Sequence, residues 1–100
     1  MLDDFIGMFS QWGHDRKITT NGSSISQAAK TVEETGELLA AILNKDKPEI
    51  EDAIGDIIVT LVMVADIEKI DMHDALSRAW ESIKDRKGHL DKSGTFIKEK

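Results

Sequence analysis

Hydrophobic positions recur at helical spacing along most of the chain. In residues 1 to about 14, apolar side chains fall three or four positions apart, which predicts an amphipathic helix. The segment KITTNGSS, residues 17–24, is rich in turn formers and predicts a loop. Ser23 or Ser24 then suits the N-cap of a second helix that runs to about Asn44. The apolar face of this second helix comprises Ile25, Ala28, Val32, Leu39, Ile42 and Leu43.

The third predicted helix contains the most apolar segment of the chain. It follows the turn NKDKP, where Asp46 or Lys47 is expected as the cap and Pro48 suits the first helical position, because a missing N–H costs nothing there. Residues 57–65, IIVTLVMVA, have the β-branched content of a buried strand. However, about 20 residues up to Lys69 contain no breaker stronger than Gly55, which exceeds the length of a normal strand. We therefore predict a helix that other helices or a second subunit cover on several sides.

Asp71 suits the N-cap of a fourth helix, which is expected to end near Lys87. The tail, residues 88–100, contains a Ser-Gly turn and is expected to form a short hairpin or an arm. The whole pattern predicts an all-α, four-helix-bundle-like fold with one domain over residues 1–100 and a short C-terminal extension. The inner stripe of the fourth helix is expected to comprise Met72, Leu76, Trp80 and Ile83.

Composition narrows the location and the chemistry. No run reaches the roughly 18 apolar residues of a membrane span, and the N-terminus lacks the order of a signal peptide, so a cytoplasmic location is expected. Without cysteine, the chain has no thiolate nucleophile and no Cys-type metal site. The net charge of -6 argues against binding to a nucleic-acid polymer. Any chemistry must come from oxygen and nitrogen groups.

The charge is unevenly distributed. Residues 30–56 hold eight carboxylates and three lysines, whereas residues 84–100 hold six basic and three acidic residues. An anionic ligand could therefore meet the basic end directly and the acidic middle through cations.

Three glutamates of the segment VEETGELL share one helix face. At about 100° per residue, Glu33, Glu34 and Glu37 lie within about 100° of one another, opposite the apolar stripe. Alone, this pattern is typical of a solvated face. Asp52 and Asp56 of the third helix, by contrast, continue the stripe of the apolar run, and we expect them to point toward the core, where an unpaired carboxylate is costly.

A short turn between the second and third helices predicts an antiparallel pair. Glu34 and Glu37 then lie about as far from the turn as Asp52 and Asp56, so the four carboxylates are expected to face one another. Such an all-oxygen site suits Mg²⁺ or Mn²⁺. Gly36 and Gly55 fit either close helix packing around this site or close packing without any metal.

The segments EETGELLAAI and EDAIGDIIVTLVMVA resemble the all-α nucleoside triphosphate pyrophosphohydrolases of the MazG-like superfamily, whose signature is ExxE followed by ExxD. Glu34 and Glu37 match the first half and Asp56 ends the second. The flanks WGHDRKI and AWESIKDRKG resemble those of short, phage-type members, so the resemblance covers about residues 9–98. The chain departs from the signature at Ala53, and the neighbouring Asp52 is expected to replace the absent glutamate.

The resemblance implies Mg²⁺-dependent hydrolysis of a nucleoside triphosphate to the monophosphate and pyrophosphate. It implies Glu34, Glu37 and Asp56 as metal ligands, Asp52 as a ligand or a supporting group, and Glu33 as a supporting group or the base that orients water.

Substrate contacts are expected from other side chains. The basic residues Lys84, Arg86 and Lys87 are candidates for the phosphate chain, or else form a solvated helix end. Trp12 is a candidate to stack on the base, although a core position is the more frequent explanation for a tryptophan. Lys30 is expected to contact a phosphate or to form a simple helix ion pair.

The third helix is too apolar for a lone thin bundle, so a homodimer or homotetramer is expected. Two other functions stay open. One is a non-catalytic helical oligomer that binds nucleotide or protein through its acidic face, which Ala53 favours. The other is a fold relative that acts on dUTP or phosphoribosyl-ATP.

Overall fold

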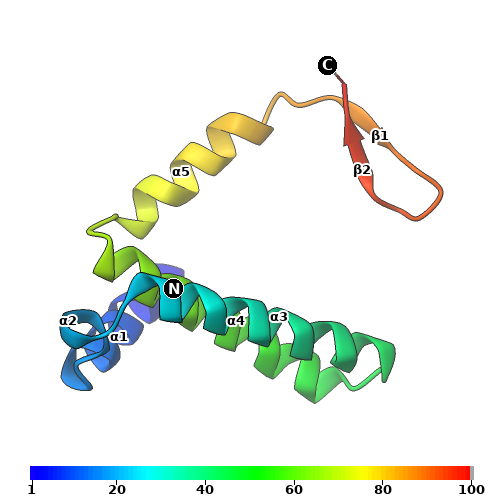
Figure 1. The fold of residues 1–100 in the computed structure, drawn as a ribbon. Coiled ribbons are helices and arrows are strands. Elements are labelled where there is room, and N and C mark those ends of the chain that lie inside the picture. Colours follow the sequence, from blue (N-terminus) through cyan, green and yellow to red (C-terminus); the bar gives the residue numbers. More distant parts are fainter. Residues whose placement is uncertain (100) are drawn as a thin grey trace.

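The computed structural model describes residues 1–99, in which helices dominate and the only strands form one short hairpin (Figure 1). The predicted all-α class is confirmed. No helix within these residues is long and apolar enough to cross a membrane. The elements are α1 (Leu2–Asp15), α2 (Ile18–Asn21), α3 (Ser24–Leu43), α4 (Lys47–Ile67), α5 (Met72–Ile83), β1 (Gly88–Leu90) and β2 (Phe96–Lys98).

Side-chain caps begin three of the helices, as the sequence predicts. The Ser23 hydroxyl accepts a hydrogen bond from the backbone N–H of Ser26 at 3.1 Å. The Asp46 carboxylate caps α4 in the same way, and the Asp71 carboxylate accepts from two backbone N–H groups of α5. These bonds satisfy amide donors that have no partner inside the helix.

Two predicted boundaries were wrong. The segment expected to be a loop contains α2, a single helical turn that starts after Lys17, whose φ is 63°. Helix α5 ends at Ile83 and not near Lys87. Beyond Ile83 the Arg86 N–H donates to the Ile83 carbonyl, three residues back, at 2.9 Å, and the chain then enters the antiparallel hairpin, where the Lys87 carbonyl accepts from the Glu99 N–H at 2.8 Å.

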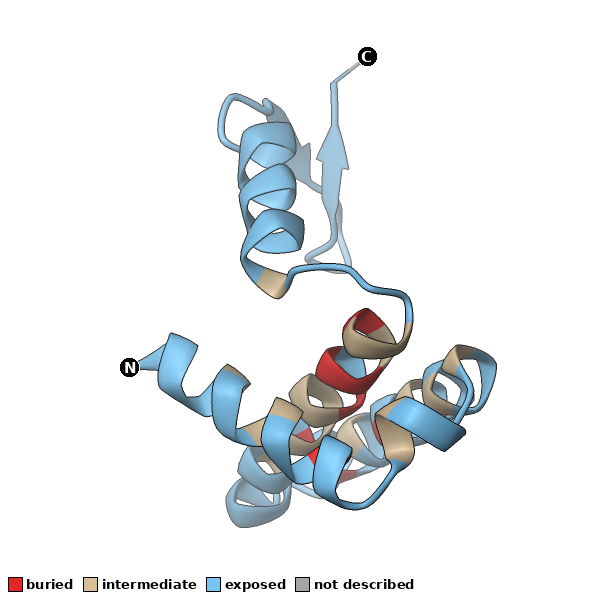
Figure 2. Cartoon of the chain, turned by 90° about the vertical axis from the view of Figure 1, so that its left-hand side faces the viewer, coloured by how far each residue is buried: buried red, intermediate tan, exposed pale blue. Residues whose placement is uncertain are grey.

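The antiparallel pair α3–α4 forms the centre of the protein. At one end of the pair, the Ser24 hydroxyl donates to Glu68 Oε2 at 2.7 Å, and at mid-height the Thr31 hydroxyl donates to the Thr60 hydroxyl at 2.8 Å. The buried residues lie mainly on α4, with Val62 and Met63 fully enclosed (Figure 2).

Helix α1 crosses α4 at a glycine. Gly13 is buried, and a Cβ placed there would collide with the Met63 side chain, so the missing side chain allows the close approach. Gly36 and Gly55, expected to allow close helix packing, have open space instead, since no neighbour among residues 1–99 lies within 4 Å of an added Cβ.

Helix α5 and the hairpin stand apart from the other elements (Figures 1 and 2). We call residues 1–71 the body and residues 72–99 the arm. Of the α5 stripe that was expected to face inward, Met72 is partly buried, whereas Leu76, Trp80 and Ile83 are exposed, with Trp80 at 59%. The radius of gyration is 15.8 Å, whereas about 13 Å is typical of a compact 100-residue domain. The protomer is therefore extended.

Candidate functional site

The three glutamates of α3 divide between two environments. Glu34 is buried against α4, with 8% of its surface exposed, whereas Glu33 and Glu37 are exposed. The expectation that the apolar stripe of α3 is its packed side was therefore wrong, and Glu34, expected opposite that stripe and facing the α4 carboxylates, lies in the packed interface. The cause is that α3 turns a stripe of small and polar residues toward α4 and leaves its apolar stripe outside, where Val32 is 74% exposed. Glu34 lies one turn after Thr31, which bonds α4, and so enters the interface.

Glu34 has a buried oxygen with no partner. Its Oε2 atom accepts no hydrogen bond from any described residue. Burial raises the pKa of Glu34, and the neighbouring Glu37 carboxylate and the charge of Asp56 raise it further, while Lys30 opposes them. Such an orphaned oxygen is unusual in a folded protein and indicates a missing cation or proton.

Asp56, on α4, also has a raised pKa. Partial burial raises its pKa, and the charges of Asp52 and Glu37 add to this effect, while Lys30 again opposes it. Of the four carboxylates expected to form a cluster, Glu34, Glu37 and Asp56 thus act on one another across the α3–α4 pair, and Asp52 acts on Asp56 along α4. Asp52, however, is exposed and not directed at the core. Within residues 1–99, no three acidic or histidine side chains are already arranged as ligands of one ion.

A cleft of about 540 Å³ opens beside the aspartates. Its acidic rim consists of Glu51, Asp52 and Asp56 from α4. Sequence reasoning missed Glu51, and it missed Phe9 of α1, whose only signal was its position one turn before Trp12. The apolar lining comprises Phe9, Pro48, Gly55 and Val59.

The position of Ala53 explains how the chain departs from the ExxD signature. Ala53 is buried, so this position does not face the cleft. Asp52 precedes it by one residue, which rotates the side chain by about 100° around the helix, and it lines the cleft instead. Asp52 therefore approaches the carboxylates from a different direction than a side chain at position 53 would.

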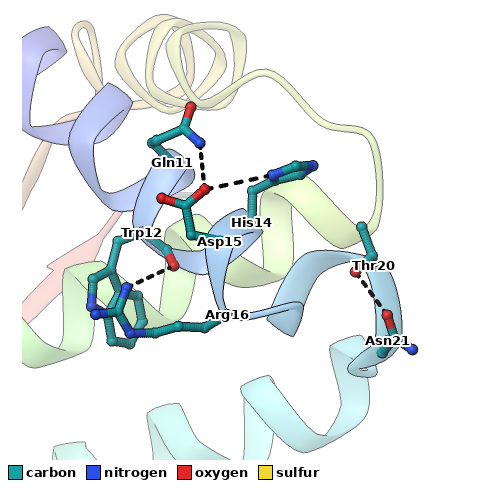
Figure 3. A network of polar contacts seen from close by, with 7 residues as sticks. All are labelled: Gln11, Trp12, His14, Asp15, Arg16, Thr20 and Asn21. Atoms are coloured by element: carbon teal, nitrogen blue, oxygen red, sulfur yellow. Dashed lines mark hydrogen bonds and ion pairs between the residues drawn. The ribbon is translucent and has the colours of Figure 1, made fainter.

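Trp12 is not a core residue. It is 42% exposed, and the Arg16 guanidinium lies over its ring at 4.6 Å from the centroid (Figure 3). Arg16 also donates to the Trp12 carbonyl at 3.3 Å. Gln11 donates to Asp15 at 2.7 Å, which holds that carboxylate on another side of α1. The indole is thus fixed near the surface by a cation–π contact.

The predicted cations separate into two groups. Lys30 lies next to the cluster, with its Nζ 3.9 Å from Glu33 Oε1, and its charge acts on both Glu34 and Asp56. Lys84, Arg86 and Lys87 belong to the arm, where Lys84 pairs with Glu81 at 2.8 Å and Arg86 donates to Ser82 at 3.1 Å. Within one chain, these three residues do not lie beside the carboxylates of α3 and α4.

Comparison with known proteins identifies a matching family and one relative. Residues 23–90 match the sequence model of the MazG nucleotide pyrophosphohydrolase domain. The chain is similar to an uncharacterized 18.2 kDa protein in the rep-hol intergenic region of Haemophilus phage HP1 (strain HP1c1), with 37% identity over 71 residues. That match covers 70% of this chain and 43% of the phage protein, so the chain spans less than half of that relative's length. No solved structure matches the chain.

Proposed function

The chain belongs to the MazG nucleotide pyrophosphohydrolase domain family, and from this premise we propose that it hydrolyses a nucleoside triphosphate, preferably a deoxynucleotide, to the monophosphate and pyrophosphate. The observation that carries the proposal is the buried, unpartnered Oε2 of Glu34, which lies within electrostatic reach of Glu37 and Asp56. In a helix pair with only a structural role, a buried carboxylate without a partner would cost stability and bring no benefit.

The donor set fits a hard divalent cation. Glu34, Glu37 and Asp56 would hold Mg²⁺ or Mn²⁺, with Asp52 as a further ligand or as a support for one. Carboxylate oxygens are the ligands that these ions prefer, and the orphaned Oε2 needs such a partner. The bound ion supplies charge neutralisation at the phosphoryl oxygens and acidifies water.

The remaining side chains have distinct roles in the proposal. Glu33, exposed beside Glu34, accepts a proton from the attacking water and orients it. Lys30 holds a phosphate oxygen as a point charge. Trp12, one turn after the cleft residue Phe9, stacks on the base, and Arg16 supports the other face of its ring.

The test is a panel of canonical and modified triphosphates, including dUTP and phosphoribosyl-ATP, with pyrophosphate detection. We expect release from at least one substrate, and its loss on addition of EDTA or on Glu37→Ala. Glu49→Gln is the matched control, because Glu49 is an exposed carboxylate of α4 outside the cleft lining. The proposal fails if no substrate releases pyrophosphate with either metal.

A second candidate is a non-catalytic helical oligomer that binds nucleotide or protein through its acidic face. The buried Ala53, at the position of the family glutamate, favours it. In that case Asp52→Asn and Asp56→Asn would leave binding intact, whereas the catalytic proposal requires at least Asp56→Asn to abolish turnover.

We also propose that the protein assembles as a homodimer or homotetramer. The exposed apolar stripe of α3 adjoins a groove of about 340 Å³ between α3 and α4. A contiguous apolar surface of this kind is typical of a protein interface. Sedimentation equilibrium tests this, with Val32→Asp as the variant that should dissociate the assembly. The groove is lined by Ala28, Thr31, Val32, Thr35, Leu61 and Val64.

A further inference from the structure

Charge is divided between the body and the arm. Residues 1–71 carry 14 acidic and six basic residues, whereas residues 72–100 carry five acidic and seven basic residues. The two parts of the chain therefore have net charges of opposite sign. Surfaces of opposite sign attract one another and set the register of association.

The arm lacks a surface to stabilise it. Helix α5 has only 12 residues, and isolated helices below about 12–15 residues are marginal in water. A lone two-stranded hairpin is marginal as well. The α5 stripe of Leu76, Trp80 and Ile83 is about half exposed, and the hairpin exposes Leu90 and Phe96. The arm therefore needs another surface to cover these side chains.

The arm's own body is badly placed to provide that surface. The arm leaves from the end of α4, and Asp56 lies 11 residues before that end, roughly 16 Å along the helix axis. The connection is short and ordered, with Lys69 at φ 60°, the Ile70 N–H bonded to the Ala65 carbonyl, and Asp71 capping α5. This connection directs α5 away from the α3–α4 pair (Figure 1).

The body has six basic residues, and none of them lines the cleft. Lys30 is the lysine that acts on the buried carboxylates, and it already pairs with Glu33. The cleft next to the carboxylates combines an apolar lining, including Phe9 and Val59, with an acidic rim. The apolar lining of the cleft matches the exposed apolar stripe of α5, and its acidic rim matches the basic residues that follow α5.

We propose that the arm of one copy packs along the cleft side of a second copy's body and places Lys84, Arg86 and Lys87 beside that copy's carboxylates. Each site is then composite, with metal-binding carboxylates from one subunit and phosphate-binding cations from the other. This proposal rests on the proposed function, in which the triphosphate chain lies between the two sets of charges. In this arrangement, the body of a second copy of this chain covers the exposed α5 stripe.

Subunit mixing tests the composite site. Glu37→Gln damages only the body, and Arg86→Ala combined with Lys87→Ala damages only the arm. Each variant alone should lose most of its activity. After joint unfolding and refolding, about one quarter of the wild-type activity should return, because a site needs one intact body and one intact arm at random. A mixture of Glu37→Gln with Asp56→Asn is the matched control and should recover nothing, since both lesions lie in the body.

If the wild type is active and the first mixture recovers no more than the control, the composite site is wrong. If the wild type is inactive on every triphosphate, the proposed function fails, and a second measurement decides the position of the arm. In Trp12→Phe, Trp80 is the remaining tryptophan. Acrylamide should quench it weakly in the assembled protein and strongly on dilution or in the added variant Leu76→Asp. Protection of Trp80 in a species that sediments as one chain, or full exposure in an oligomer, would overturn the proposal.

Discussion

A methyl group at Gly55 should make the protein more stable and less active. Gly55 lies inside α4, and an added Cβ has no described neighbour within 4 Å, so alanine meets no steric obstacle in this part of the chain. Alanine in place of glycine in a helix interior stabilises by about 0.5–1 kcal/mol. In a domain of this size, each kcal/mol of added stability raises the Tm by roughly 4–8 °C.

The same methyl group enters the cleft, which Gly55 lines between Asp52 and Asp56. A displacement of about 1 Å in a bound substrate can cost about a hundredfold in rate, so we expect kcat/KM for pyrophosphate release to fall about tenfold or more. Gly7→Ala is the matched control, because Gly7 lies inside α1 with equally open space around its added Cβ and outside this cleft. It should gain similar stability with unchanged activity.

Urea unfolding and pyrophosphate release, measured on both variants, separate the two effects. Loss of stability in Gly55→Ala with a gain in Gly7→Ala would show that something covers the cleft at Gly55 in the folded protein. Equal activity of Gly55→Ala and the wild type would refute the assignment of this cleft to the substrate.

Three further predictions concern charge and the hairpin. Asp56→Asn should raise the urea midpoint of the metal-free protein, because it removes repulsion from Asp52 and Glu37, while abolishing turnover; an unchanged or lower midpoint contradicts this. The pKa values of Glu34 and Asp56 are raised in the folded state, so the folded protein binds these protons more tightly than the unfolded chain. Stability without metal should therefore fall as the pH rises from the ordinary carboxyl pKa through the raised values. Mg²⁺ should reduce this fall. A rise in the thermal denaturation midpoint over that pH window would contradict the raised pKa values of Glu34 and Asp56. Gly88→Ala should unpair the hairpin, because its Cβ would collide with the Ile97 carbonyl oxygen, a backbone atom that cannot rotate away; retention of the cross-strand amide protection in hydrogen exchange would contradict this.

Local features of the fold were predictable because they depend on neighbours in the sequence. The caps at Ser23, Asp46 and Asp71 each act over two or three residues, and the chemistry of the capping side chain decides them. The helical nature of the apolar run in α4 followed from its length, which no ordinary strand reaches.

The end of α5 and the position of the arm were not predictable in this way. Residues 84–87 have no helix breaker, yet α5 ends at Ile83, and the Lys87 carbonyl accepts a hydrogen bond from the Glu99 N–H. That hydrogen bond joins residues 12 positions apart, and helical periodicity carries no information about it. The expectation that the α5 stripe faces inward also presupposed a neighbour that the protomer does not provide.

The sequence by itself determined which residues share a helix face and that acidic groups gather around the turn between α3 and α4. Only the tertiary structure decided that Glu34 is the buried member of its group, that Asp52 lines a cleft while Ala53 is enclosed, and that the basic arm lies away from its own carboxylates. The physical reason is that the period of a helix fixes angles between side chains along one element. Which neighbour each face meets depends on packing between elements, such as the close approach of α1 at Gly13 and the Thr31–Thr60 bond.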